Sequence, residues 1–405
     1  MELTEGGVCA AKGFSAGSVH CGIRKSPLKD DLALIVSDTV CQAAAVYTTN
    51  KVKAAPLHVT KAHLADGTAR AVIANSGNAN ACAPNGEENA HREAKAAADA
   101  LGIPEDEIVV ASTGVIGVEL PIECIEAHAA KIRPAASADG SAAAAKAIMT
   151  TDTEPKSCAV SFSAGGKTCH LGGICKGSGM IHPNMGTMLC FLTTDCAITH
   201  EVLDAALKSV VKKTFNRVTV DGDTSTNDMC VVLANGAAEN NVITSADGPD
   251  YEAFCTALLT VCVALAKKIA GDGEGATRLL TCTVTGASDE EKAENLAKSI
   301  CGSSLVKAAM FGADANWGRV LCAMGYSGAE FDPETVEILF SSSKGDISVC
   351  KNGRGLLFSE ELAKEILSED SVEITAKLSE GDASVSCWGC DLTYDYVKIN
   401  GDYRT

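Results

Sequence analysis

The sequence predicts a mixed α/β protein whose C-terminal third changes to an α+β pattern. Two short apolar runs, 71–74 and 108–111, flank an alanine-rich helical stretch at 88–101. A strand, a helix and a strand in that order are typical of an α/β layer. Further along, residues 372–378 alternate apolar and polar side chains, which is the period of a half-buried antiparallel strand.

The individual elements follow from local signals in chain order. The helix at 88–101 begins after the turn Pro84-Asn85-Gly86 and stops at Gly102. The segment 157–174 predicts a hairpin, because two apolar runs flank Gly165-Gly166. Further helices are expected at 201–213, 251–270 and 289–300, and strands at 336–340 and 372–378.

Two details complete this organisation. Ser288 and Glu291 have the spacing of a capping box, which is expected to start the helix at 289–300. The change of pattern places a boundary near residue 280, so we expect an α/β body over 1–280 and a C-terminal α+β domain over 281–405.

Small polar residues follow both N-terminal strands. Asn75 to Asn80 come after the first strand, and Ser112, Thr113 and Gly114 come after the second. Loops at strand ends are frequent positions for functional residues, so we expect a site there.

Charge and composition exclude several classes of partner. The 405 residues carry 52 acidic and 34 basic side chains, a net charge of −18. Nucleic acids and anionic membranes are therefore not expected as partners, because both require clustered Lys and Arg. The apolar stretch 253–270 is interrupted by Lys267 and Lys268 and is expected to be too polar to span a bilayer. With no signal segment at the start, we expect a cytoplasmic protein.

The 19 cysteines are expected to be reduced core thiols rather than a disulfide scaffold. Cys387 and Cys390 have the spacing of a redox pair. No second pair exists for a zinc ribbon, and no βαβ pattern frames a thioredoxin motif. We therefore expect a structural role for both.

Common ligand motifs are absent or incomplete. Gly165-Gly166-Lys167-Thr168 lacks the earlier glycine of a phosphate-binding loop, and Gly177-Ser178-Gly179 lacks the third glycine of a dinucleotide fingerprint. The segment 221–228 carries three carboxylates and suits either a hard cation or a set of tight hydrogen-bonded turns. No metal site and no cofactor are predicted.

The segment 176–195 carries the clearest chemical signal. A glycine-rich loop leads through Pro183 to Gly186 and Thr187, and an apolar run follows. The Thr187 hydroxyl can attack the Gly186 carbonyl, and hydrolysis of the resulting ester leaves an N-terminal threonine. Its α-amino group, with a pKa of about 7.7–8.0, can then accept the hydroxyl proton without a histidine. On the local pattern alone, Thr187 can equally be an ordinary residue that begins a strand.

The chain as a whole resembles the ornithine acetyltransferase family, the glutamate N-acetyltransferases of the cyclic arginine pathway. Nine strings occur in the family's order: EGGV with AKGF within 5–14, NSGNANAC at 75–82, STGVIG at 112–117, MTTDT at 149–153, KGSGMIHPNMGTML at 176–189, VDGDTSTND at 220–228, GDGEGATR at 271–278, FGADANWGR at 311–319 and NGDYRT at 400–405.

The resemblance implies a fold of the self-processing N-terminal-nucleophile aminopeptidase and ornithine acetyltransferase type. It also implies cleavage between Gly186 and Thr187, which gives chains 1–186 and 187–405, and transfer of acetyl from N2-acetyl-L-ornithine to L-glutamate through Thr187 in a ping-pong cycle. Acetyl-CoA is an additional donor in bifunctional members. The cleaved chains are expected to stay associated and to form an α2β2 assembly.

The same resemblance assigns the site residues. Thr113 and Gly114 match the oxyanion hole. The substrate-binding positions that it implies are Thr150, Lys176, Thr187, Glu274, Asn400 and Thr405. Lys176 suits an amino-acid carboxylate, and Glu274 would face the amino end of the substrate.

Each assigned residue also has an ordinary interpretation. Thr113-Gly114 can be a plain turn, and Lys176 a solvated loop charge. Glu274 can be a surface carboxylate, and the segment from Asn400 to Thr405 a frayed end.

Position 186 departs from the family, which usually has alanine before the nucleophile. Gly186 does not block attack, but its backbone freedom makes the attack-ready conformer less populated, so cleavage is expected to be slower. The main alternative to the transferase is an amidase or aminopeptidase that uses the same Thr187. A non-catalytic binding protein with an intact Gly186-Thr187 bond is the third hypothesis.

Overall fold

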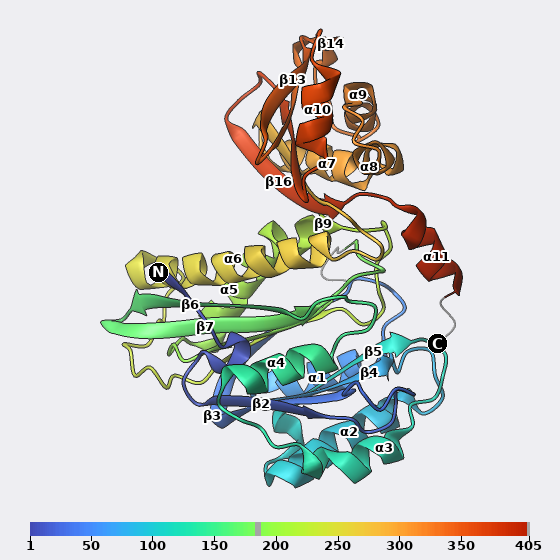
Figure 1. Ribbon diagram of the computed structural model, residues 1–405. Helices are drawn as coiled ribbons and strands as arrows, with labels where there is room; N and C mark the ends of the chain where they lie inside the picture. Colours follow the sequence, from blue (N-terminus) through green and yellow to red (C-terminus); the bar gives the residue numbers. More distant parts are fainter. Residues whose placement is uncertain (183–187, 403–405) are drawn as a thin grey trace.

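The computed structural model describes residues 1–182 and 188–402, which form one sheet of nine strands and one of seven, with helices packed on both (Figure 1). The first sheet has the order β1-β6-β7-β8-β10-β3-β4-β5, and β2 pairs with β3. Its strands are β1 (Glu2–Thr4), β2 (Phe14–Val19), β3 (Leu32–Tyr47), β4 (Thr68–Asn78), β5 (Ile108–Val115), β6 (Lys156–Ala164), β7 (Lys167–Lys176), β8 (Leu189–Thr194) and β10 (Met229–Ala234).

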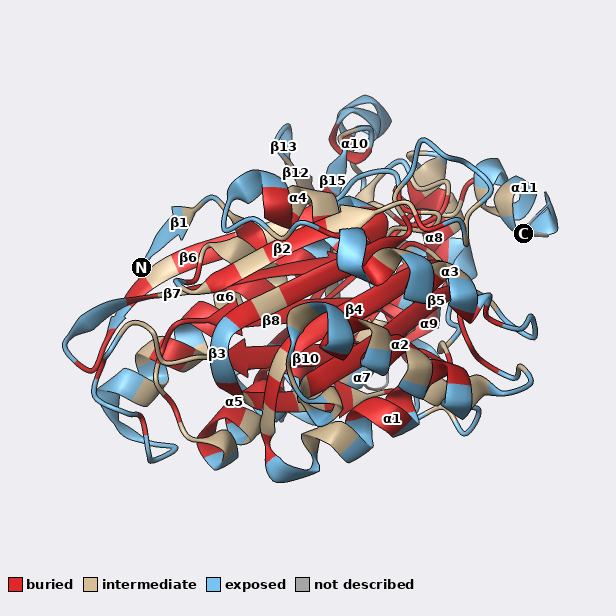
Figure 2. Ribbon diagram, turned by 90° about the horizontal axis from the view of Figure 1, so that it is seen from below, coloured by how far each residue is buried: buried red, intermediate tan, exposed pale blue. Residues whose placement is uncertain are grey.

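Helices cover this sheet on both faces. α6 packs on β6 and β7, α5 on β3, α4 on β2, and α1 and α2 on β5. The central strands are consequently buried along most of their length (Figure 2), and β8 is buried at every residue. The helices of this part are α1 (Ala55–His63), α2 (Gly86–Leu101), α3 (Ile122–His128), α4 (Ala138–Ala147), α5 (His200–Lys213) and α6 (Gly248–Gly271).

Local signals located several of these elements correctly. The helix predicted at 88–101 is α2, and Gly102 ends it in the left-handed region with φ of 68°. The predicted hairpin is β6 and β7, joined by Gly165 and Gly166 with φ of 54° and 77°. A turn with positive φ at both positions matches the twist of the strands, so both predictions are confirmed.

The sequence suggested loops for the polar segments after the two N-terminal strands, but in the structure the strands continue into both segments. β4 continues to Asn78 and β5 to Val115. The two strands run parallel, with Asn75 paired to Ser112 and Ser76 to Thr113. This pairing satisfies the backbone of polar residues that taken singly favour a turn.

The second sheet has the order β14-β13-β12-β15-β11-β16-β9 within the described ranges. α7 packs on β11 and β16, and α10 on β12 and β13. The strands are β9 (Val218–Thr219), β11 (Leu279–Ala287), β12 (Glu337–Ser342), β13 (Gly345–Lys351), β14 (Arg354–Gly355), β15 (Ser371–Lys377) and β16 (Ala383–Cys390), and the helices are α7 (Glu290–Gly302), α8 (Ser304–Phe311), α9 (Trp317–Gly325) and α10 (Glu360–Leu367), followed by α11 (Tyr394–Asp402).

Two expectations for this part need correction. β15 pairs antiparallel with β12 as expected, but parallel with β11, so the sheet is mixed. The cap of α7 is Asp289 rather than Ser288: the Asp289 carboxylate accepts the Lys292 N–H at 2.8 Å, and the Ser288 hydroxyl donates to Asp289. A charged acceptor at the helix N-terminus is favoured over a hydroxyl.

Helix α6 of the first layer contacts β9, β11 and β16 of the second sheet. Within that sheet β9, whose residues come from the middle of the chain, pairs parallel with Trp388 and Gly389 of β16. The pattern change predicted near residue 280 falls where β11 begins. The division into domains at that position stays a prediction.

Most of the cysteines are core residues: 13 are buried, four are half-buried, and Cys82 and Cys322 are exposed. All 19 lie in the described ranges and are free thiols. Cys387 and Cys390 lie three positions apart on β16, and each belongs to a different hydrophobic core, Cys387 to that of the second sheet and Cys390 to that of the first. Burial raises the pKa of Cys390 to about 11, which makes its thiol unreactive at neutral pH. The pair packs the junction.

Among the described helices, α6 alone is long and apolar enough to cross a membrane by those two criteria. Its most apolar window of 18 residues has a mean hydropathy of 1.8, so the expectation that this stretch is too polar is wrong. However, α6 packs on β6 and β7, and Phe254, Leu258 and Leu265 are fully buried. α6 is therefore the core helix of the first layer.

Two leucines of the C-terminal part test the core of the second sheet. Leu367 at the end of α10 is fully buried, and Leu357 is fully exposed. We expect Leu367→Ala to lower the free energy of unfolding by about 2–5 kcal/mol, because it removes buried methyl groups and leaves a cavity. Leu357→Ala should change it by less than about 0.5 kcal/mol. Urea unfolding measures both, and equal losses would contradict the packing described here.

Candidate functional site

A cavity of about 520 Å³ opens where β5, β7 and β8 meet the loop after α6 and helix α11. The predicted site residues that lie within the described ranges all line it: Thr113, Gly114, Thr150, Lys176, Glu274 and Asn400. These residues are separated by up to 287 positions (400 − 113) in the sequence, and the fold brings them to one place.

The other predicted site residues, Gly186, Thr187 and Thr405, lie outside the described residues. Met188 and Leu189, which directly follow Thr187 in the sequence, line the same cavity and are buried.

Thr113 and Gly114 form one wall of the cavity on β5. Gly77 of β4 pairs with Gly114, whose φ is 137°. A Cβ at position 114 would collide with the backbone of Gly77, so this close approach requires glycine. The wall therefore offers a hydroxyl and an uncovered peptide at strand ends, the kind of groups that can face a developing negative oxygen.

Lys176 is the last residue of β7 and is buried rather than solvated. Its Nζ lies 3.9 Å from Oδ2 of Asp152. The same Oδ2 accepts the Thr150 N–H at 3.0 Å, and Oδ1 accepts the Gly177 N–H at 2.7 Å. Asp152 therefore holds the backbone of both predicted binding segments at the cavity.

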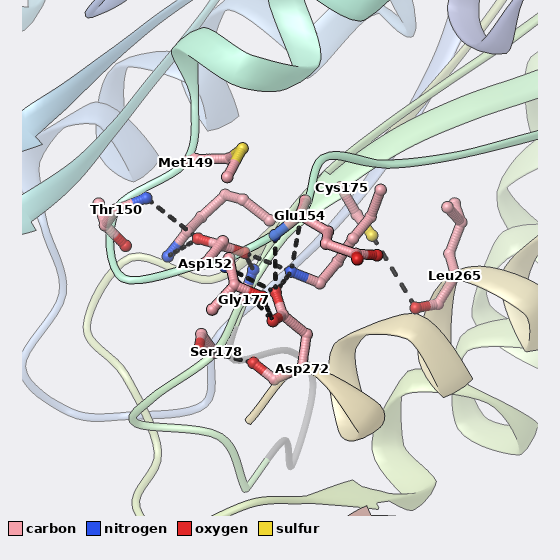
Figure 3. A network of polar contacts seen from close by, with 12 residues as sticks. Met149, Thr150, Asp152, Glu154, Cys175, Gly177, Ser178, Leu265 and Asp272 are labelled. Carbon is pink, nitrogen blue, oxygen red and sulfur yellow. Dashed lines mark hydrogen bonds and ion pairs between the residues drawn. The ribbon is translucent and has the colours of Figure 1, made fainter. Parts of the chain in front are cut away.

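A second lysine completes this network. Nζ of Lys156 lies 2.7 Å from Oδ1 of Asp152 and 2.5 Å from Oδ2 of Asp272. Asp272 also accepts from the backbone N–H groups of Thr153 and Glu154. Figure 3 shows Asp152 and Asp272 in one network of polar contacts, with Thr150 and Gly177 bonded to Asp152. The carboxylates of Asp152 and Asp272 and the two lysines thus join three segments of the chain, 150–156, 176–177 and 272.

Burial and charge act in opposite directions in this network. Burial alone would raise the pKa of Asp152, but the Lys176 and Lys156 ammonium groups outweigh it and hold that pKa well below its usual range. For Lys176, burial dominates and lowers the pKa, because the attraction of Asp152 offsets only part of the desolvation.

Glu274 and Asn400 close the cavity from the C-terminal side. The Glu274 N–H donates to the carbonyl of Ser178 at 2.9 Å, and its Oε2 accepts the Asn400 side-chain N–H at 2.8 Å. Glu274 is buried, so it is not a surface carboxylate. Asn400 lies on α11, which extends from the second sheet towards the first (Figure 1), so this end of the chain is folded against the site.

Two further residues of the cavity, Asn227 and Asp228, were considered in the sequence only as part of a candidate cation segment. Asn227 Nδ2 donates to the carbonyls of Ala79 and Ser112 at 2.6 and 2.8 Å, which ties this segment to the ends of β4 and β5. Asp228 lines the cavity with a buried carboxyl. Its position directly before the apolar run of β10 is the signal that could have singled it out.

The acidic segment 221–228 makes turns. Asp221 accepts the N–H groups of Met180 and Ile181 at 2.6 and 2.8 Å and that of Asp223 at 3.1 Å. Its carboxylate is thus occupied by backbone donors, which is the turn alternative of the two that the sequence left open.

Three side chains that could together hold a metal ion lie elsewhere in the part of the chain that the structure describes. His63, His91 and Glu105 offer ligand atoms within 4.8 Å of one another. None of the three lines the cavity. Nδ1 of His91 lies 3.0 Å from Glu105, so an ion pair or hydrogen bond already accounts for that contact.

Comparison with known proteins gives concordant matches. The model of the ArgJ family matches residues 15–405. The arginine biosynthesis bifunctional protein ArgJ of Symbiobacterium thermophilum is 50% identical over 407 residues, which cover 100% of both chains.

Two solved structures also match. The arginine biosynthesis bifunctional protein of Bacillus halodurans is 50% identical, covers 52% of this chain and 97% of its own, and has a TM-score of 0.49. An ornithine acetyltransferase from Mycobacterium tuberculosis, complexed with ornithine, is 40% identical, covers 44% of this chain and 95% of its own, and has a TM-score of 0.41.

The contribution of Asp152 to this network can be measured as a change in the free energy of unfolding. The pKa of Asp152 in the folded state lies below its unfolded value, so its carboxylate stabilises the fold above about pH 4, and this contribution fades as the pH falls further. We expect Asp152→Asn to cost about 3–5 kcal/mol at neutral pH, because it takes a charged partner from two buried ammonium groups, of which Lys156 keeps Asp272.

The loss caused by Asp152→Asn should shrink when urea unfolding is repeated near about pH 3, where the Asp152 carboxyl is protonated in the unfolded chain but still ionised in the fold. Asp346→Asn, at an exposed position of β13, is the matched control and should have little effect. A loss for Asp152→Asn that does not depend on pH would show that the charge of Asp152 is not what stabilises the network.

Proposed function

The chain belongs to the ArgJ family, and on that premise we propose that it is a glutamate N-acetyltransferase that moves an acetyl group from N2-acetyl-L-ornithine to L-glutamate. The match spans the whole length of the chain and of a curated relative named for arginine biosynthesis. The observation that carries the proposal is that the predicted site residues within the described ranges line one cavity, beside the residues that follow Thr187.

We propose that the reaction proceeds in two halves through Thr187. Self-cleavage after Gly186 frees the α-amino group of Thr187. In the first half, the Thr187 oxygen attacks the acetyl carbonyl and its proton passes to the α-amino group, which gives that proton to the ornithine nitrogen as the carbon–nitrogen bond breaks. In the second half, the amine of glutamate attacks the acetyl ester and loses a proton to the α-amino group, which passes it to the threonine oxygen as the ester bond breaks.

The residues of the cavity have complementary roles in this proposal. Thr113 and Gly114 stabilise the negative oxygen of the tetrahedral intermediate. Lys176 binds a substrate carboxylate, and its partial desolvation strengthens that attraction. Glu274, held by Asn400, faces the amino end of the substrate. Thr150 and Thr405 are the remaining proposed binding residues.

Several further properties belong to the same proposal. Acetyl-CoA is a second acetyl donor for glutamate, in keeping with the word bifunctional in the relative's name. The enzyme needs no metal and no bound cofactor, since the threonine supplies both nucleophile and base. The two chains, 1–186 and 187–405, stay associated as α2β2 in the cytoplasm.

The alternative is a self-processing amidase or aminopeptidase that uses the same nucleophile. The two differ in the acceptor of the acyl group, because a transferase must shield its acyl-enzyme from water and present a bound amine. Excess of labelled acetylglutamate over free acetate from N-acetylornithine and glutamate supports the transferase. Free acetate alone supports the hydrolase.

Intact-mass spectrometry tests the nucleophile directly. We expect the wild type to give two fragments that divide between Gly186 and Thr187, and Thr187→Ala to give one full-length chain without transferase activity. The loss of the hydroxyl removes both the attacking group for cleavage and the acyl acceptor. A wild-type chain that transfers acetyl while it remains intact would contradict the mechanism.

Gly179 tests the position of Glu274. A Cβ at position 179 would collide with the carboxylate of Glu274, so Gly179→Ala must displace it. We expect the KM for glutamate to rise about tenfold or more, with self-cleavage retained, because one buried charged contact corresponds to about 1.5–3 kcal/mol. Gly325→Ala is the control, since no atom lies within 4 Å of its Cβ position. Unchanged kinetics in Gly179→Ala would place Glu274 outside the binding site.

A further inference from the structure

Asp228 lines the cavity, although it is shielded from bulk solvent. It is 1% exposed and lines the cavity directly before β10. Within the ranges that the structure describes, its Oδ2 has no hydrogen-bond partner. An unpaired buried carboxyl oxygen costs free energy, so its presence in a ligand cavity requires an explanation beyond folding.

The register between β10 and β8 determines which residue lies beside Asp228. β10 and β8 run parallel, with Met229 paired to Leu189. The Met229 N–H donates to the carbonyl of Met188 at 2.9 Å. Asp228 therefore lies level with Met188, the residue that follows Thr187 in the sequence.

Among the described residues that line the cavity, Asp228 is the one whose carboxyl has a buried oxygen without a hydrogen-bond partner. The charged side chains that line the cavity in the described ranges are Lys176, Glu274 and Asp228 itself. Glu274 is bonded to Asn400. Burial raises the pKa of Asp228 well above its usual range, and the hydroxyls of Ser225 and Thr48, the backbone of Met188 and the Lys176 ammonium offset only part of that effect.

In the proposed transfer, Thr187 does not account for the additional proton on the ammonium group of the amino acid. Amino acids enter as ammonium ions at neutral pH, yet only a neutral amine can attack an ester. The α-amino group of Thr187 exchanges the proton of its own hydroxyl. The additional proton of the incoming ammonium needs another acceptor, and the amine that leaves in the first half-reaction needs a donor.

We propose that Asp228 is this proton acceptor and donor. The inference rests on the proposed acetyltransferase function. An N–H bond of the glutamate ammonium breaks as an O–H bond forms on Asp228. The amine then forms its bond to the acetyl carbon, and the ester bond to Thr187 breaks. In the other half-reaction, the Asp228 carboxyl returns the proton to ornithine, which leaves as an ammonium ion, so the proton count closes over one cycle.

Two acceptors separate this role from a structural one. The enzyme is acetylated with p-nitrophenyl acetate, whose leaving group departs without a proton, and the acetyl-enzyme is then treated with glutamate or with hydroxylamine, which is largely unprotonated at neutral pH. In Asp228→Asn we expect deacetylation by glutamate to fall about 10²–10⁴-fold and that by hydroxylamine to change only a few-fold. Asp223→Asn, exposed in the same segment, is the matched control.

The pH dependence gives a second test, made on the ratio of the glutamate rate to the hydroxylamine rate, in which titration of the Thr187 α-amino group cancels. In Asp228→Asn this ratio should rise about tenfold per pH unit between about pH 7 and about pH 9, following the free amine. In the wild type the ratio should rise less steeply, because the ammonium ion is the form used once Asp228 is ionised. Equal slopes in the two proteins would overturn the proposal, and so would a wild-type ratio that rises tenfold per unit up to about pH 9, even if Asp228→Asn failed to fold or cleave.

Other outcomes are equally decisive. Equal slowing with both acceptors, or no slowing with either, would reduce Asp228 to a packing residue. A wild type that forms no acetylglutamate from N-acetylornithine refutes the transferase itself, which is a separate result from an active wild type with an unaffected Asp228→Asn.

Discussion

The site depends on one buried carboxylate, that of Asp152. It lies between the Lys156 and Lys176 ammonium groups and accepts the backbone N–H groups of Thr150 and Gly177. Removing two lysine ammonium groups from water costs free energy, and pairing with the Asp152 carboxylate offsets that cost. Through this one group the end of β7, the start of β6 and the loop after α4 hold a fixed geometry, and Lys156 extends the contact to Asp272 after α6. A substrate charge placed against Lys176 therefore meets a preorganised surface.

The cavity also depends on the joining of the two sheets. Its floor comes from strand ends of the first sheet, and its C-terminal wall comes from α11, which follows the last strand of the second. Contacts of α6 with β9, β11 and β16 form this junction, and Cys387 and Cys390 of β16 pack into the two cores on either side of it. The hydrogen bond between Asn400 and Glu274 then couples the C-terminal helix to the residue that we propose for the amino end of the substrate.

Much of the fold could be predicted from short-range signals, whereas the site could not. Gly102 and the pair Gly165-Gly166 end a helix and form a turn through their own backbone preferences, so local reasoning located them. The strand assignment of Asn75 and Thr113 depends on pairing between β4 and β5, which no local pattern contains. The network of Asp152 and Asp272 joins residues 120 positions apart (272 − 152), and it was missed for the same reason. The site residues came from the family resemblance. The sequence offered Asp228 only as one carboxylate of a candidate cation segment, and its burial and its unpaired oxygen were needed to single it out.

The central claim is that acetyl passes through an ester on Thr187 in this cavity. It is tested most directly by incubating the wild-type enzyme with N-acetylornithine that carries a ¹³C-labelled acetyl group, quenching in acid and mapping the label by tandem mass spectrometry. The account predicts the label on the first residue of the fragment that begins at Thr187, and its disappearance into acetylglutamate when glutamate is added before the quench. Label on another side chain, or labelled acetylglutamate formed without any label on Thr187, would contradict it.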